Sequence, residues 1–233
     1  MCCAGFFTRN GRFATFLVLT TAIIFAQQAK ASIIAYSFDT VFSGTTPPAA
    51  PGPWIQATFQ DVSPGTVDLT VTNVGLSTGE FIGGVYFNLK PTDNATNLTL
   101  SLTSSHGSFT IPSISLGTDS FKADGDGKYD ILLTFDTSNG KTFTVNDSLT
   151  YKITGIAGLT AADFEYLSAP AGGSGPFYAA AHYQGTPPNN GGSCWVEPNM
   201  GPQIVSVPEP APQLLMALAA ALWFGARRIL SKR

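Results

Sequence analysis

The sequence predicts an all-β protein, a jelly-roll-like β-sandwich, between two short apolar end segments. Three observations support this class. Segments rich in β-branched and aromatic residues recur along the chain, several of them alternate between apolar and polar residues, and no helical pattern of ten or more residues separates them. Parallel α/β folds need such helices between their strands, so they are disfavoured.

The expected strands follow one another with turn-forming residues between them. They cover residues 33–40, 54–62, 66–74, 81–89, 95–103, 129–136, 141–154 and 177–184. In one of them, Leu98, Leu100 and Leu102 alternate with Thr and Ser, which puts one face in the core and the other in water.

Turn and cap residues add local expectations. Asn139-Gly140, between two apolar runs, predicts a β-hairpin. Thr160 followed by Asp163 predicts a capping box at the start of a short helix. Residues 185–193 are rich in Gly, Pro and Asn, so we expect a loop there.

The N-terminal segment has the three parts of a secretory signal peptide. Arg9 and Arg12 precede an apolar run at residues 13–26, and a small-x-small cleavage site ends at Ala31. Ser32 is then the first mature residue. The apolar run is shorter than the roughly 20 residues of a membrane-spanning helix. The alternative is a buried N-terminal helix of the mature fold.

The C-terminal segment shows a related arrangement in the opposite order. A Pro-Glu-Pro motif is followed by a short apolar stretch at residues 214–226 and by basic residues. The motif residues are Val207, Pro208, Glu209 and Pro210, and the first basic pair is Arg227 and Arg228. The prolines favour an extended, protease-accessible backbone, and the basic end favours the cytoplasmic side of a membrane.

These C-terminal features together resemble the PEP-CTERM sorting signal. The resemblance covers about the last 27 residues and implies processing by an exosortase near the motif. With the signal peptide, it implies export by the Sec translocon through the inner membrane of a Gram-negative-type bacterium. The chain would be anchored transiently and then reach the cell surface or extracellular matrix. The alternative is a permanent single-pass anchor.

The expected organisation is a signal peptide at 1–31, an exported β-sandwich domain at 32–197, a linker at 198–206 and the sorting signal at 207–233. Residues 32–207 carry five Lys and no Arg against fourteen Asp and Glu, a net charge of −9. Such a domain is repelled by phosphate, which argues against nucleic acid as a partner. Cys194 is the one cysteine of this part, and burial, intermolecular pairing and a free thiol all stay open.

An Asp-rich segment suggests a metal site. Asp124, Asp126 and Asp130 alternate with Gly and Lys in a spacing that resembles the calcium loops of FG-GAP repeats and EF-hands. Lys122 stands where those loops place their first Asp, and Asp119 or Asp136 could supply a missing ligand. The alternatives are a weak Ca²⁺ site and an acidic turn that only joins two strands.

A second candidate site lies near the end of the domain. His182 and Gln184 share one face of the 177–184 strand, on the same side as Tyr178, and Trp195 or Trp54 could stack beside them. Such a face suits a sugar, although residues of this kind also face solvent or complete a core.

We do not expect an enzyme. The two histidines, His106 and His182, stand in neither a nucleophile-elbow nor a metal-ligand spacing. The leading interpretation is therefore a non-catalytic surface or matrix protein associated with exopolysaccharide. A calcium-supported carbohydrate-binding module is the second interpretation. A glycan-active enzyme is the third, and it would need two carboxylates in one cleft.

Overall fold

Alternating side chains build an antiparallel, strand-rich fold. The computed structural model describes residues 31–44, 46–199 and 201–207 of the 233-residue chain. The strands are β1 Ala31–Gly44, β2 Ile55–Ser63, β3 Thr66–Asn73, β4 Phe81–Phe87, β5 Thr99–His106, β6 Ser113–Lys122, β7 Lys128–Thr134, β8 Ser148–Thr154, β9 Ala179–Thr186, β10 Gly192–Pro198 and β11 Gln203–Val207. Two 3₁₀ helices, η1 Ala95–Asn97 and η2 Ala161–Phe164, complete the elements of the described part. In β3, buried and half-buried residues alternate without a break, as a strand with one core face requires.

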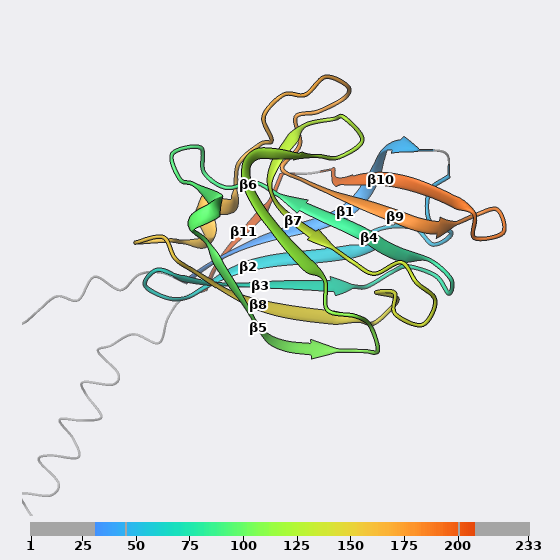
Figure 1. The fold of residues 1–233 in the computed structure, drawn as a ribbon, viewed down its shortest axis with the longest axis horizontal. Coiled ribbons are helices and arrows are strands. Elements are labelled where there is room, and N and C mark those ends of the chain that lie inside the picture. The colour runs from blue at the N-terminus through green and yellow to red at the C-terminus, as the bar shows by residue number, and fades with distance from the viewer. Residues whose placement is uncertain (1–30, 45, 200, 208–233) are drawn as a thin grey trace, which may run out of the picture.

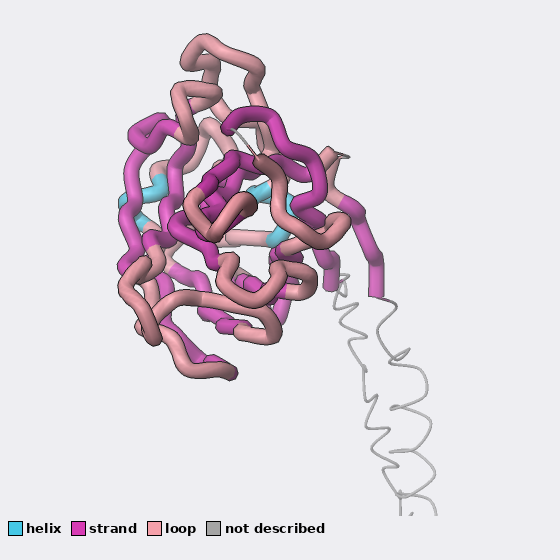
Figure 2. The backbone as a smooth tube through the Cα atoms, turned by 90° about the vertical axis from the view of Figure 1, so that its right-hand side faces the viewer, coloured by secondary structure: helices cyan, strands magenta, loops and turns pink. Residues whose placement is uncertain are grey.

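One continuous sheet folds into two layers at β1. The strand order is β5-β8-β3-β2-β1-β10-β9-β4-β7-β6, with β11 also paired to β1 (Figure 1). The first half of β1 pairs with β2, and its second half pairs with β10 after register shifts beyond Phe38 and Val41. Such irregularities bend a strand, so β1 can belong to both layers. Figure 2 shows the strands curving around a common interior.

Aromatic side chains join the two layers in the core. Phe59 of β2 stacks on Phe164 of η2 with ring centroids 4.2 Å apart, and it meets Phe87 of β4 edge-on at 5.1 Å. The Tyr36 hydroxyl donates to the carbonyl of Phe164 at 2.7 Å. These contacts fix η2 against β1 and β2, the Phe59–Phe87 pair joins the layers, and the Tyr36 hydroxyl is satisfied.

The all-β class and several local predictions are confirmed. The capping box between Thr160 and Asp163 is present, with the Asp163 carboxylate accepting from both the backbone nitrogen and the hydroxyl of Thr160. Cys194 is fully buried, and burial raises the pKa of its thiol to about 12. Of the alternatives for Cys194, the structure therefore supports the buried residue.

Other local predictions were wrong. Asn139-Gly140 forms a turn but not a hairpin, because β7 pairs with β4 and β6 whereas β8 pairs with β3 and β5. The segment therefore crosses between layers, and only the second half of the expected 141–154 strand is extended, as β8. β10 begins at Gly192, inside the expected 185–193 loop.

Three strands were not predicted, namely β10, described above, and also β6 and β11. β6 contains Gly117 and Asp119, turn-type residues that interrupt its pairing with β7 between Leu116 and Phe121. β11 occupies Gln203–Val207, the end of the predicted 198–206 linker and the first residue of the predicted sorting signal, and pairs with the first residues of β1. Partner strands supply what β6 lacks in local propensity, whereas β11 is rich in β-branched residues and was missed because its segment was interpreted as a linker.

The predicted end segments fall outside the described residues, apart from the residues that start β1 and end β11. No helix of the described part is long and apolar enough to cross a membrane.

Candidate functional site

The most distinctive surface lies on the outer side of β9 and β10. Trp195 and His182 are direct cross-strand partners, and their rings stack with centroids 4.3 Å apart at an interplanar angle of 14°. Cys194 and Val196, the neighbours of Trp195 in β10, are buried in the core, so period-two alternation turns Trp195 outward. The structure thus brings together two of the predicted binding residues.

Gln184 joins the same group. Its Nε2 lies 3.2 Å from Nδ1 of His182, two residues earlier on the same face of β9. The adjacent strand β4 has a glycine, Gly83, at this point. A Cβ on Gly83 would lie only 2.9 Å from Nε2 of Gln184 and 3.2 Å from Nδ1 of His182. The glycine therefore leaves the space that both polar side chains occupy.

Tyr86 of β4 extends this surface. Its ring lies 5.5 Å from that of Trp195 and 5.6 Å from that of Tyr129, which is fully buried beneath the outer surface. We call Tyr86, His182, Gln184 and Trp195 the aromatic face. Tyr86 was missed in the sequence, although the alternation of the 81–89 segment already separates it from its buried neighbours Val85 and Phe87.

Charges border the aromatic face on two sides. Burial lowers the pKa of His182, while the nearby charge of Asp124 acts in the opposite direction. Glu197 follows Trp195 on the same side of β10, and burial, together with the charge of Asp39, raises the pKa of Glu197 to about 7. His182 is therefore neutral at pH 7, and Glu197 can exchange a proton near that pH.

Other predicted binding residues lie elsewhere. Trp54 is buried in the core, edge-on to Tyr183 at 5.8 Å, and its indole N–H donates to the carbonyl of Ala50. Tyr178 precedes β9 and packs against the main core. The pattern of the strand could not show this, because β9 begins only at Ala179.

The structure does not bring the predicted calcium residues together. Asp124 accepts a hydrogen bond from the Ser43 hydroxyl, and Asp126 accepts one from the backbone nitrogen of Ser174. Asp130 accepts from the backbone nitrogens of Leu89 and Asp119, both at 2.8 Å. Each carboxylate thus serves a different local contact. Within the described residues, no three His, Cys, Asp or Glu side chains form a group that could hold a metal ion.

The predicted processing sites lie partly within the described chain. Ala31 and Ser32 open β1, and Val207 ends β11 as the register partner of Ala31. The remaining motif residues Pro208, Glu209, Pro210, Arg227 and Arg228 lie outside the described residues.

Comparisons with known proteins add little. No protein-family model and no curated protein matches the chain. A solved structure that is similar is a biomass-sensing module of an RsgI-like protein from Clostridium thermocellum, described as resembling the family 3 carbohydrate-binding module of the cellulosome. It is 11% identical, with a TM-score of 0.29, over 66% of this chain and 92% of that chain. A TM-score this low carries no argument about this protein.

Proposed function

We propose that the chain is an exported, non-catalytic protein that is sorted through its C-terminal segment and binds surface or matrix polysaccharide through the aromatic face. The observation that carries this proposal is the outward Trp195–His182 stack, flanked by Tyr86 and Gln184. Aromatic rings offer flat apolar area to the C–H face of a sugar, and the amide and imidazole supply hydrogen bonds to its hydroxyls.

The ends of the domain support attachment at one point. Ala31 pairs with Val207, so the two proposed processing sites lie side by side. Trp195 pairs instead with Ser43, twelve residues further along β1. At the rise of an extended strand this separation is roughly 35 to 40 Å before bending. A chain held at its β1–β11 end would therefore present the aromatic face away from the anchor.

A contact at Ser32 supports cleavage before that residue. The backbone nitrogen of Ser32 lies 3.1 Å from Oδ2 of Asp61, which also accepts from the Ser32 hydroxyl at 2.7 Å. Cleavage would convert this nitrogen into a charged amino group beside a carboxylate. A charge-assisted hydrogen bond is stronger than the hydrogen bond of a neutral backbone N–H that it would replace.

Affinity electrophoresis in gels that contain polysaccharide tests the binding proposal. We expect the exported chain to be retarded by a polysaccharide of its own envelope, and Trp195→Ala to weaken this binding at least tenfold. Tyr166→Ala is the matched control, since Tyr166 is an exposed aromatic residue outside the aromatic face. Equal binding by all three proteins would contradict the role of this face.

Mass spectrometry of the chain recovered from producing cells tests the sorting proposal separately. We expect a first residue of Ser32 and a C-terminus near the Pro-Glu-Pro motif. A chain that still ends at Arg233 would contradict exosortase processing and leave the binding proposal intact.

A further inference from the structure

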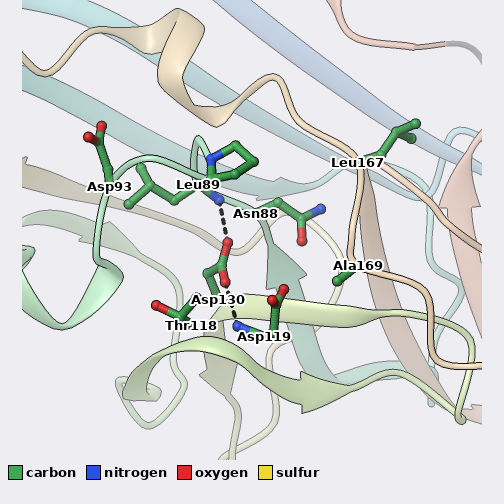
Figure 3. A pocket seen from close by; sticks show the side chains of 9 residues that line it. Asn88, Leu89, Asp93, Thr118, Asp119, Asp130, Leu167 and Ala169 are labelled. Atoms are coloured by element: carbon green, nitrogen blue, oxygen red, sulfur yellow. Dashed lines mark hydrogen bonds between the residues drawn. The ribbon is translucent and has the colours of Figure 1, made fainter.

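A small acidic cleft lies on another part of the same sheet, where β4 ends beside β6 and β7. It encloses about 160 Å³ and is lined by Asn88, Leu89, Pro91, Asp93, Thr118, Asp119, Asp130, Leu167 and Ala169 (Figure 3). Asp119 and Asp130 face the inside of this cleft, whereas the carboxylate of Asp93 points away from them (Figure 3). Within the described residues, no Lys or Arg forms a salt bridge with any of these three carboxylates.

Asn88 directs an unpaired oxygen into the cleft. Its Nδ2 donates to the carbonyls of Tyr166, Phe177 and Tyr178, at 3.0, 3.2 and 2.8 Å. These three acceptors fix which end of the amide carries the nitrogen, so Oδ1 must point to the opposite side. The residue is only 2% exposed, and its Oδ1 has no hydrogen-bond partner. A buried amide oxygen without a partner costs about 1 to 3 kcal/mol, so a water or a bound ion is expected to contact it.

The two carboxylates are held in place by the backbone. Each oxygen of Asp130 accepts one backbone N–H, from Leu89 and from Asp119, and keeps its remaining lone pairs free. Asp119 sits in the interrupted part of β6 with a φ of 51°, a left-handed conformation that turns it toward Asp130. Two negative charges and a buried amide oxygen therefore converge on one space.

We propose that Asn88 Oδ1, Asp119 and Asp130 bind a calcium ion. The donors are all oxygens, as a hard cation requires, and the cleft has room for several waters to complete six to eight ligands. A calcium ion approaches an oxygen to about 2.4 Å, closer than a hydrogen-bonded water at about 2.8 Å, which suits the deeply buried Oδ1. Of this set, Asp130 belongs to the calcium residues predicted from the sequence, Asp119 was named there as a possible further ligand, and Asn88 is new.

A sugar fits this cleft less well. Its volume lies below the roughly 300 to 1,000 Å³ of typical small-molecule sites. A space of this size suits an ion with its waters better than a sugar ring.

The ion would connect segments that are distant in the sequence. Asn88 directly follows β4, Asp119 belongs to β6 and Asp130 to β7, while the Asn88 amide also fixes the backbone of residues 166–178. Phe177 in that segment packs on Phe42 at 4.6 Å, beside the aromatic face. The site is nevertheless independent of polysaccharide binding and can be tested without it.

Calorimetric titration of the exported chain with CaCl₂ after EDTA treatment tests the proposal, together with thermal unfolding in 5 mM Ca²⁺. We expect one site with a Kd of about 0.1 to 1 mM and a rise in Tm of about 3 to 5 °C. Asp119→Asn should abolish both effects. The variant should fold normally, because Asn tolerates the left-handed conformation and the substitution removes a charge repulsion.

Two matched variants make the test specific. Asp93→Asn removes the same charge from the same cleft, and Asp124→Asn removes it from the sequence-predicted set; both should keep calcium binding. Retained binding in Asp119→Asn would overturn the proposal, as would a wild-type Tm that does not respond to calcium. Loss of stability by Asp119→Asn to the same extent with EDTA and with calcium would mean a structural role only and would equally overturn it.

Discussion

The aromatic face and the acidic cleft lie on the same layer of the fold, the one formed by β10, β9, β4, β7 and β6, but they differ in how their polar groups are paired. On the aromatic face, half-buried rings stack on one another and the polar groups pair among themselves, as His182 and Gln184 do. In the cleft, Asn88 Oδ1 has no hydrogen-bond partner among the described residues, and no Lys or Arg of that part of the chain forms a salt bridge with Asp119 or Asp130. The first site is complete before a ligand arrives, whereas the second is electrostatically incomplete. Any ligand that binds only the folded chain stabilises it by an amount set by its concentration relative to its Kd, so calcium should stabilise the chain whether or not polysaccharide is bound.

The largest expected effect comes from removing the amide that organises the cleft. Asn88→Ala leaves three carbonyls without their donor, which should lower the free energy of unfolding by about 3 kcal/mol in urea. Asn94→Ala is the matched control and should cost about 1 kcal/mol or less, because Asn94 only caps the exposed turn at η1. Polysaccharide binding by folded Asn88→Ala should persist. Its loss would show that the two sites are not separate.

A second prediction concerns pH at the edge of the aromatic face. The folded-state pKa of Glu197 is about 7 and lies above the unfolded value near 4.5, so the folded state retains a proton that the unfolded state has lost. Stability from this group is therefore greatest below about pH 4.5 and decreases as pH rises through 7, by about 1 to 3 kcal/mol after allowance for solvent screening. Glu197→Gln should reduce this decrease in urea unfolding between pH 5 and 8. An unchanged pH dependence would contradict the environment assigned to Glu197.

The smallest expected effect comes from adding a methyl group at Gly83, beside the side chains of His182 and Gln184. A Cβ in Gly83→Ala would meet Nε2 of Gln184 and Nδ1 of His182, both on side chains that can shift, so the stability cost should be about 1 kcal/mol. Polysaccharide affinity should nonetheless decrease several-fold, because both polar groups move. Gly140→Ala is a control for adding a methyl where space is open, although its φ of 77° adds strain. Unchanged affinity in Gly83→Ala would remove His182 and Gln184 from the binding site.

The two regions also differ in how far the sequence predicts them. Period-two alternation was enough to place His182 and Gln184 on one side of a strand, and the all-β class follows from the same pattern. It could not show that Trp195 lies opposite His182, because β10 begins in a Gly- and Asn-rich segment. Pairing across the sheet decides that contact, and pairing is a property of the whole fold.

The cleft as a whole could not be predicted from local patterns, although the sequence named Asp130 and Asp119 as possible calcium ligands. Asp119 lies in an interruption of β6, which its turn-type residues made unrecognisable as a strand, and Asn88 is contributed by another part of the sheet. The Asp-rich spacing of residues 124–130 led instead to carboxylates that the folded chain uses in separate contacts. Spacing along a loop predicts a metal site only where one loop supplies most of the ligands.

Tryptophan fluorescence of the processed chain tests the central claim most directly. Trp223 lies in the proposed sorting segment, so processing would leave Trp54, which is 5% exposed, and the half-buried Trp195. We expect the polysaccharide that retards the chain in gels to change the emission saturably, and Trp195→Ala to abolish this change. Binding without any change in emission would place the polysaccharide elsewhere and contradict the account.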